Sequence, residues 1–114
     1  MANRILVVGG AGYIGSVCAA HLLAHGAEVE VYDNLSTGHR DAVTGTLHEG
    51  DIRDHSSLLR VLRGGRFDAV MHFAAKSLVG ESVAHPLRYF DVNVGGTATL
   101  VRAMLDAGVQ SLVF

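Results

Sequence analysis

The sequence predicts an α/β fold in which a parallel sheet of about five strands carries helices on both faces. Short apolar, β-branched runs alternate along the chain with segments of helical periodicity. A glycine-rich turn follows the first apolar run and opens the first helical segment. Strands that alternate with helices are joined by right-handed crossovers, so neighbouring strands should be parallel. Because 49% of the 114 residues are hydrophobic and 18% are charged, one packed domain is expected.

The first half of the chain contains three predicted strands and one helix. We expect a strand over Arg4–Val8, a helix over Tyr13–His25, a strand over Glu28–Tyr32 and a short strand near Thr46–Glu49. Gly26 is a natural residue for the end of the helix. The apolar stripe of this helix, expected to face the sheet, consists of Ile14, Val17, Cys18 and Leu22.

The second half continues the alternation. Asp54 is predicted to cap a helix that ends at Gly64–Gly65 and buries Leu58, Leu59, Val61 and Leu62. A strand over Phe67–His72 and a loop from Phe73 to His85 should follow. Pro86 suits the first residue of a helix that runs to about Ala107 through Phe90, Val94, Leu100, Val101 and Met104, and Gly108 closes it.

Gln110–Phe114 is predicted to begin a fifth strand, and the sequence ends within this apolar run. A doubly wound sheet normally continues beyond this point. We therefore expect residues 1–114 to form an incomplete domain.

The loop Gly9-Gly-Ala-Gly12-Tyr-Ile-Gly15 has the spacing G-x-x-G-x-x-G between a predicted strand and a predicted helix. In the Rossmann type of dinucleotide-binding fold, one glycine permits the tight turn, one leaves room for a pyrophosphate, and one lets the helix pack against the strand. The amides and the dipole at the helix N-terminus then favour an anion. No Gly-Lys-Ser/Thr follows, so the loop is not a P-loop.

Asp33 lies at the end of the second predicted strand, about 20 residues beyond the loop. A carboxylate there can accept hydrogen bonds from the adenosine ribose and would repel a 2′-phosphate, which favours NAD over NADP. The alternative is that Asp33 only caps the turn that it begins.

Further motifs give the chain a resemblance over its whole length. They are Asp33-Asn-Leu-Ser-Thr-Gly38, Glu49-Gly-Asp-Ile-Arg53, His72-Phe-Ala-Ala75, Val79-Gly-Glu-Ser-Val83 and Asn93-Val-Gly-Gly-Thr97. With the glycine loop, they resemble the N-terminal, NAD-binding part of the UDP-glucose (UDP-galactose) 4-epimerase family, in the extended short-chain dehydrogenase/reductase superfamily.

The resemblance implies a set of cofactor contacts. Backbone groups of Tyr13 and Ile14 would meet the pyrophosphate, and Asp51 and Ile52 would flank the adenine. The other implied cofactor-binding residues are Gly9, Gly12, Gly15, Asp33, Asn34, Leu35, Ser36, Thr37, Gly38, Phe73, Ala74, Ala75, Lys76, Ser77 and Asn93. The chain departs from the family pattern at three positions: Val8 replaces a Thr, Val92 replaces an Asn, and the lysine is Lys76 where the family has it one residue later.

The resemblance also shows what is missing. In the family, a Ser or Thr and a Tyr-x-x-x-Lys pair perform catalysis. None of the three tyrosines here has a lysine four positions later, because the residues that follow Tyr13, Tyr32 and Tyr89 at that spacing are Val17, Ser36 and Asn93. We therefore predict no catalytic residue here, and a UDP-sugar substrate only for a longer parent protein. A homodimer through the Pro86–Ala107 helix is implied. A stand-alone, non-catalytic dinucleotide-binding module, or part of a related sugar-nucleotide dehydratase or decarboxylase, is the alternative.

Composition argues against several other classes of function. The net charge is −2, so a nucleic-acid or membrane partner is not expected. The only cysteine, Cys18, excludes an intrachain disulfide and fits the cytoplasm. His21 and His25 share a helical spacing but have no evident third ligand, so no metal site is predicted. His72 is expected to be a buried, hydrogen-bonded residue rather than an acid or base.

Overall fold

The computed structural model describes residues 3–43, 45–74 and 79–114. Its five strands form one parallel sheet in the order β3-β2-β1-β4-β5. The strands are β1 (Arg4–Val8), β2 (Glu28–Asp33), β3 (Thr46–Glu49), β4 (Ala69–His72) and β5 (Leu112–Val113). The predicted fold class is confirmed, and the strand order reverses between β1 and β4, where sheets of this kind bind ligands.

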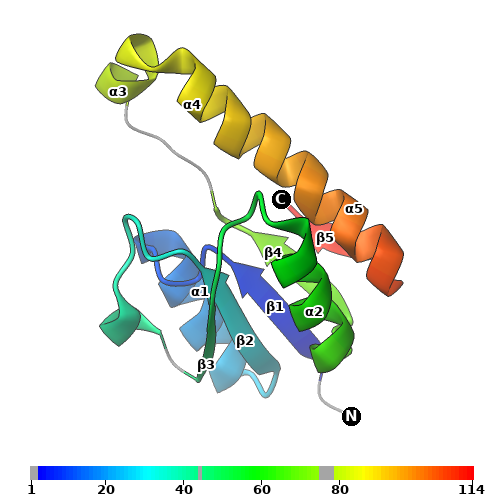
Figure 1. Ribbon diagram of the computed structural model, residues 1–114. Helices are drawn as coiled ribbons and strands as arrows, with labels where there is room; N and C mark the ends of the chain where they lie inside the picture. Colours follow the sequence, from blue (N-terminus) through cyan, green and yellow to red (C-terminus); the bar gives the residue numbers. More distant parts are fainter. Residues whose placement is uncertain (1–2, 44, 75–78) are drawn as a thin grey trace.

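Helices cover both faces of the sheet (Figure 1). They are α1 (Tyr13–Ala24), α2 (His55–Gly65), α3 (Val79–Ala84), α4 (Pro86–Phe90) and α5 (Thr97–Ala107), with a 3₁₀ turn at Arg40–Ala42. A π-helical segment, Asp91–Gly96, joins α4 to α5. Figure 1 shows α4, this segment and α5 as one long rod, with α3 at the end far from β5.

Side chains that alternate along β1 enter two separate apolar cores. Leu6 and Val8 are fully buried beneath α2 and α5, together with Leu58 and Leu100 from those helices. Val7 points to the opposite face, where the core includes Ala19 of α1. This alternation follows from the pleat of a strand. Because β1 is buried on both faces, it carries the glycine loop at its carboxyl end in a fixed position.

The expected apolar stripe of α1 was wrong in part. Ile14 and Val17 are exposed by 66% and 56%, whereas the buried residues of this helix are Gly15 and Ala19. The helix uses its smallest residues against the sheet because the glycine loop holds its first turn close to β1. Cys18 lies at the edge of this contact, half-buried, with its Sγ 3.8 Å from Sδ of Met71.

Two predicted boundaries also need correction. A third is confirmed, because α2 ends at Gly65, and Arg66 adopts the left-handed conformation at its C-cap (φ 51°). The strand expected from Phe67 begins at Ala69. The expected loop from Phe73 to His85 contains α3, and its residues 75–78 lie outside the described part of the chain. By contrast, Asp54 caps α2 as predicted, because its side chain accepts a hydrogen bond from Ser57 N.

Candidate dinucleotide-binding site

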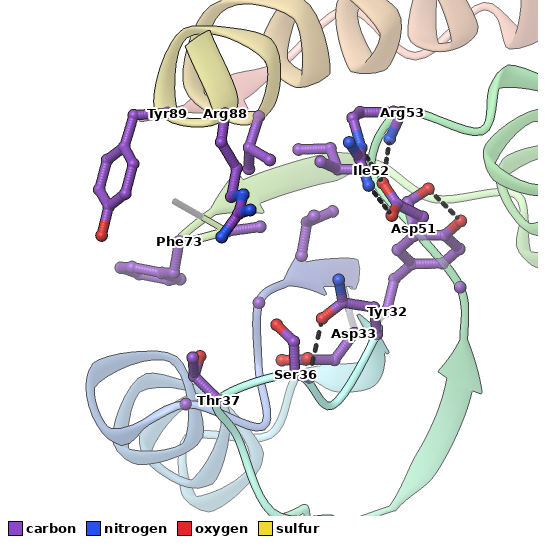
Figure 2. Close-up of a pocket in the computed structure, with 17 residues that line it drawn as sticks. Tyr32, Asp33, Ser36, Thr37, Asp51, Ile52, Arg53, Phe73, Arg88 and Tyr89 are labelled. Carbon is purple, nitrogen blue, oxygen red and sulfur yellow. Dashed lines mark hydrogen bonds and ion pairs between the residues drawn. The ribbon is translucent and has the colours of Figure 1, made fainter. Parts of the chain in front are cut away.

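A cavity of about 460 Å³ opens at the carboxyl ends of β1, β2 and β4, beneath α4 and the π-helical segment. Figure 2 shows its wall, to which the glycine loop, the turn after β2, the loop after β3 and the start of the loop after β4 all contribute. The lining residues are Val8, Gly9, Gly12, Tyr32, Asp33, Asn34, Ser36, Thr37, Gly50, Asp51, Ile52, Arg53, Phe73, Ala74, Arg88, Tyr89 and Val92.

The three glycines of the G-x-x-G-x-x-G spacing, Gly9, Gly12 and Gly15, have three different surroundings. Gly9 turns the chain with a φ of +84°, and a Cβ there would lie 2.6 Å from Ala74 N. A Cβ on Gly15 would collide with the carbonyl oxygen of Gly9, so this glycine brings α1 against the loop. A Cβ on Gly12 would meet only Gly9 O, at 3.5 Å. Gly12 therefore leaves space on the cavity side, as a pyrophosphate would require.

The first turn of α1 provides backbone donors at the same place. The first helical hydrogen bond runs from Ser16 N to Gly12 O (2.9 Å). The amides of Tyr13, Ile14 and Gly15 precede this bond and so have no partner within the helix. The side chains of Tyr13 and Ile14 are exposed by 86% and 66%, so their backbones would be the part that meets an anion.

Asp33 ties the turn after β2 to the glycine loop. Its Oδ2 accepts a hydrogen bond from Ala11 N (2.9 Å), and its Oδ1 accepts one from Leu35 N (2.7 Å). The second bond means that Asp33 does cap its own turn. The first shows that capping is not its only role. A carboxylate can accept about four hydrogen bonds, so capacity for two ribose hydroxyls remains.

The turn itself is pressed against the glycine loop. Leu35 adopts a left-handed conformation (φ 62°), which is uncommon outside glycine and marks a constrained turn. A Cβ on Gly38 would lie 2.6 Å from the carbonyl carbon of Ala11, and His39 N donates to Ala11 O (3.1 Å). The glycine loop and the turn therefore form one unit that shapes the pyrophosphate and ribose side of the cavity.

Ion pairs lie at the opposite end of the cavity. Arg53 binds both carboxylate oxygens of Asp51, from Nη2 to Oδ2 at 2.8 Å and from Nε to Oδ1 at 3.0 Å. It also reaches Asp91 of the π-helical segment (2.7 Å). These carboxylates raise the pKa of Arg53, first through the hydrogen bond to Asp51. The pairs fasten the loop after β3 to the helix above the cavity.

His72 fastens the floor of the site to the same rod. It is buried at the end of β4, where Nδ1 accepts from Ala74 N (3.2 Å) and Nε2 lies 2.9 Å from Thr97 Oγ1. Since Thr97 Oγ1 donates to Asn93 O (2.7 Å), the proton of the neutral ring must be on Nε2. His72 is thus the buried, hydrogen-bonded residue predicted, and burial lowers its pKa below the ordinary value.

This lowered pKa predicts a pH dependence of stability. Between the folded-state pKa and about 6.5, the unfolded chain binds more protons at His72 than the folded chain does. The contribution of neutral His72 to the free energy of unfolding is therefore complete above pH 6.5 and is lost as the pH falls toward the folded-state pKa. Replacing His72 by Asn keeps an acceptor for Ala74 N but cannot be protonated, so it should remove this dependence.

Urea unfolding from pH 8 to pH 5 measures the effect as the difference between wild type and His72→Asn. We expect the advantage of the wild type to shrink as the pH falls, by up to about 1.4 kcal/mol for each unit by which the pKa is lowered. The subtraction cancels the other six histidines. A difference that stays constant over this range would contradict the assignment.

The cavity wall contains ten of the predicted cofactor residues: Gly9, Gly12, Asp33, Asn34, Ser36, Thr37, Asp51, Ile52, Phe73 and Ala74. Six others lie outside the wall, namely Tyr13, Ile14, Gly15, Leu35, Gly38 and Asn93. Ala75, Lys76 and Ser77 lie outside the described residues. For all of these predicted residues, inside and outside the wall, contact with a cofactor remains a prediction.

Sequence reasoning missed two residues that approach from the long rod, Arg88 and Tyr89, and singled out Val92 only as a departure from the family pattern. All three line the cavity, as do Tyr32 and Arg53 from the sheet side. Tyr32 is 1% exposed and donates to Asp51 O (2.8 Å), and its burial raises its pKa. The helical spacing of Arg88 and Val92 was the available signal, because residues four apart share one face of a helix.

No helix within the described ranges is long and apolar enough to cross a membrane. In that same part of the chain, no group of three or more His, Cys, Asp or Glu side chains could hold a metal ion.

A parallel sheet with a glycine loop after β1 and a carboxylate at the end of β2 defines a dinucleotide-binding domain of the Rossmann type. Comparison with known proteins narrows the class. A model of the NAD dependent epimerase/dehydratase family matches residues 5–114. The chain therefore belongs to the NAD dependent epimerase/dehydratase family.

Similar proteins agree with this family. A UDP-glucose 4-epimerase of Streptomyces lividans is 54% identical over 117 residues, which cover 100% of this chain and 36% of that protein. One from Klebsiella pneumoniae is 43% identical, and the match covers 97% of this chain and 86% of that relative. The crystal structure of UDP-glucose 4-epimerase from Brucella ovis in complex with NAD has a TM-score of 0.95 at 48% identity, covering 97% of this chain and 34% of that chain.

The chain thus spans about a third of the length of most of these relatives. The similarity to the N-terminal part of UDP-glucose 4-epimerases and the choice of NAD as the cofactor of the family are both confirmed.

Proposed function

We propose that this chain is the NAD-binding portion of a UDP-glucose 4-epimerase and is inactive alone. The observation that carries the proposal is the joint geometry of the glycine loop and Asp33. The open side of Gly12 faces the cavity where a pyrophosphate would lie, and the first-turn amides of α1 follow directly after it in the chain. Asp33, bonded to Ala11 of the same loop, lies where the adenosine ribose would follow.

The residues present fit NAD better than NADP. The 2′-phosphate of NADP would approach the Asp33 carboxylate, and among the described residues no cation pairs with Asp33 to offset the repulsion. The chemistry that bound NAD would supply is the acceptance of a hydride and its return. The chain itself would position the two nucleotides and keep the adenosine end fixed through Asp51 and Arg53.

Two assays on the purified chain test this proposal. Calorimetric titration should show NAD binding at least tenfold tighter than NADP, a difference of about 1.4 kcal/mol. Incubation with NAD and UDP-galactose should yield no UDP-glucose, because the chain contains no Tyr-x-x-x-Lys sequence. Turnover by the chain alone, or no binding of NAD, would refute the proposal. If the natural protein binds NAD but its sequence continues into no segment with a Tyr-x-x-x-Lys pair, the stand-alone dinucleotide-binding module is favoured instead.

We also propose that the UDP-sugar is a ligand only of a longer parent protein and that the chain acts in the cytoplasm. The single, half-buried Cys18 is compatible with a reducing compartment.

A homodimer through the long rod is proposed on a separate observation. Exposed apolar residues recur on α4, the π-helical segment and α5 at i, i+3, i+7, i+14 and i+18, a spacing that places them along one stripe of a helix. They are Leu87, Phe90, Val94, Val101 and Leu105, with exposures from 37% to 82%. Two such stripes would cover each other in an isologous interface.

Light scattering after size-exclusion chromatography tests the dimer. Phe90→Glu should convert the chain from a dimer into a monomer with unchanged NAD affinity, because this substitution places a charge within the apolar stripe. Arg102→Glu, on the same rod but outside the stripe, should leave the dimer intact. A wild-type chain that is monomeric at 100 µM, roughly a hundredfold above a micromolar dissociation constant, would contradict the interface.

A further inference from the structure

The loop after β3, residues 50–53, lines the end of the cavity where the adenosine lies in the proposed function. Two contacts hold this loop from opposite sides. On the side of the rod, Gly96 approaches so closely that a Cβ on it would lie 2.5 Å from Ile52 Cγ2. On the side of the sheet, Tyr32 lies against Gly50, where an added Cβ would collide with the tyrosine hydroxyl. The loop therefore has little room to move in either direction.

The hydroxyl of Tyr32 is a polar anchor for this loop. The tyrosine is 1% exposed, and its hydroxyl donates to Asp51 O over 2.8 Å (Figure 2). Asp54 N also donates to this carbonyl (3.0 Å), but Asp54 belongs to the same stretch of chain and moves with it. The bond from Tyr32 is different, because it ties the Asp51 carbonyl to β2, the strand that ends in Asp33.

Ser57 of α2 completes a buried pair of hydroxyls. Its Oγ lies 3.0 Å from the Tyr32 oxygen. A carbonyl can only accept and a tyrosine has one hydroxyl proton, so with that proton directed at Asp51 O the Ser57 hydroxyl donates to Tyr32. Removing the Ser57 hydroxyl would therefore leave the bond from Tyr32 to the loop in place, and the two hydroxyls can be separated by mutation.

We infer that Tyr32 is a positioning residue of the cofactor site, whose hydroxyl holds the loop after β3 where this loop meets the adenosine half of the dinucleotide. The inference rests on the proposed NAD-binding function. A loop that occupies its binding position only part of the time lowers the apparent affinity by that fraction. One intramolecular hydrogen bond is enough to shift such an equilibrium about fivefold. Tyr32 O also accepts from Gly9 N (2.7 Å), so this residue contacts both the glycine loop and the loop after β3.

Calorimetric titration of the chain with NAD and with ADP tests this role. Tyr32→Phe keeps the buried ring and should weaken the binding of both ligands about fivefold, because both contain the adenosine. Ser57→Ala is the matched control, since it removes the other hydroxyl of the pair and leaves Asp51 O its bond from Tyr32. This control should bind both ligands within about twofold of the wild-type affinity.

Urea unfolding of the same variants separates positioning from stability. Both single variants should unfold at a lower urea concentration than wild type, because each breaks the buried hydroxyl pair. The double variant Tyr32→Phe/Ser57→Ala leaves no unpaired serine hydroxyl, so it should be at least as stable as Tyr32→Phe. It should still bind NAD as weakly as Tyr32→Phe, and it therefore reports on Tyr32 even if the single variant does not fold.

The other outcomes overturn the inference in distinguishable ways. Wild-type affinity for NAD in Tyr32→Phe or in the double variant would refute the role of Tyr32 and leave the proposed function intact. An equal loss of affinity in Ser57→Ala would show that the stability of the fold, and not the bond to the loop, determines binding. A loss for NAD without a loss for ADP would locate the effect outside the adenosine half. Failure of the wild-type chain to bind NAD would refute the proposed function and this inference with it.

Discussion

Replacing Gly15 by alanine is expected to abolish measurable NAD binding and to destabilise the fold. The new methyl group would collide with the carbonyl oxygen of Gly9 and would lie 2.9 Å from Gly10 Cα, both of them backbone atoms that cannot rotate away. The helix would have to move away from the loop, which takes its first-turn amides away from the pyrophosphate. Losing two hydrogen bonds to a charged group at about 1.5–3 kcal/mol each predicts at least a hundredfold loss of affinity.

Overpacking of this kind costs about 1–3 kcal/mol of unfolding free energy. The matched control is Gly64→Ala in α2, where a Cβ meets nothing within 4 Å. That variant should bind NAD like wild type and gain up to about 1 kcal/mol, because alanine is the better helix former. Urea unfolding and calorimetry on both variants measure the two effects. Equal NAD affinity for Gly15→Ala and wild type would contradict the packing role of Gly15.

Asp33→Ala is expected to weaken NAD binding about a hundredfold and to remove the preference for NAD over NADP. The substitution deletes the acceptor for the ribose hydroxyls, and it also releases Ala11 N and Leu35 N, which position the glycine loop and the turn. The affinity for NADP should fall less, because the repulsion between the carboxylate and the 2′-phosphate disappears at the same time.

Asp41→Ala supplies the matched control for Asp33. Asp41 is an exposed residue of the 3₁₀ turn, outside the cavity wall, and its replacement changes the net charge equally. NAD and NADP affinities should remain at the wild-type values. Should Asp33→Ala retain the wild-type ratio of NAD to NADP affinity, the carboxylate would not be the group that selects the cofactor.

The fold was predictable because its signals are local. Periodic apolar runs located all five strands, and the side chain of Asp54 caps α2 as its position before an apolar stripe indicated. The inward face of α1 was not predictable from hydrophobicity. Gly15 and Ala19 face the sheet because a close helix–strand contact requires small residues, whereas Ile14 and Val17 remain exposed.

The site was predictable on its sheet side and not on its helical side. The glycine loop and Asp33 are recognisable because they follow consecutive strands at a fixed separation. Arg88 and Val92 reach the cavity only because the rod passes over the sheet, an arrangement set by packing of α5 against α2 and the core. The π-helical segment that contains Val92 has no signal in the sequence, although such segments often mark functional sites.

The central claim is that backbone amides beside the glycine loop hold a pyrophosphate while Asp33 holds the adenosine ribose. The most direct measurement is the change of backbone amide resonances in ¹⁵N-labelled chain during titration with NAD. We predict saturable shifts at Gly12, Tyr13, Ile14 and Leu35, and none at Arg4, at the opposite end of β1. Saturable binding of NAD that leaves the resonances of the glycine loop unchanged would contradict the claim.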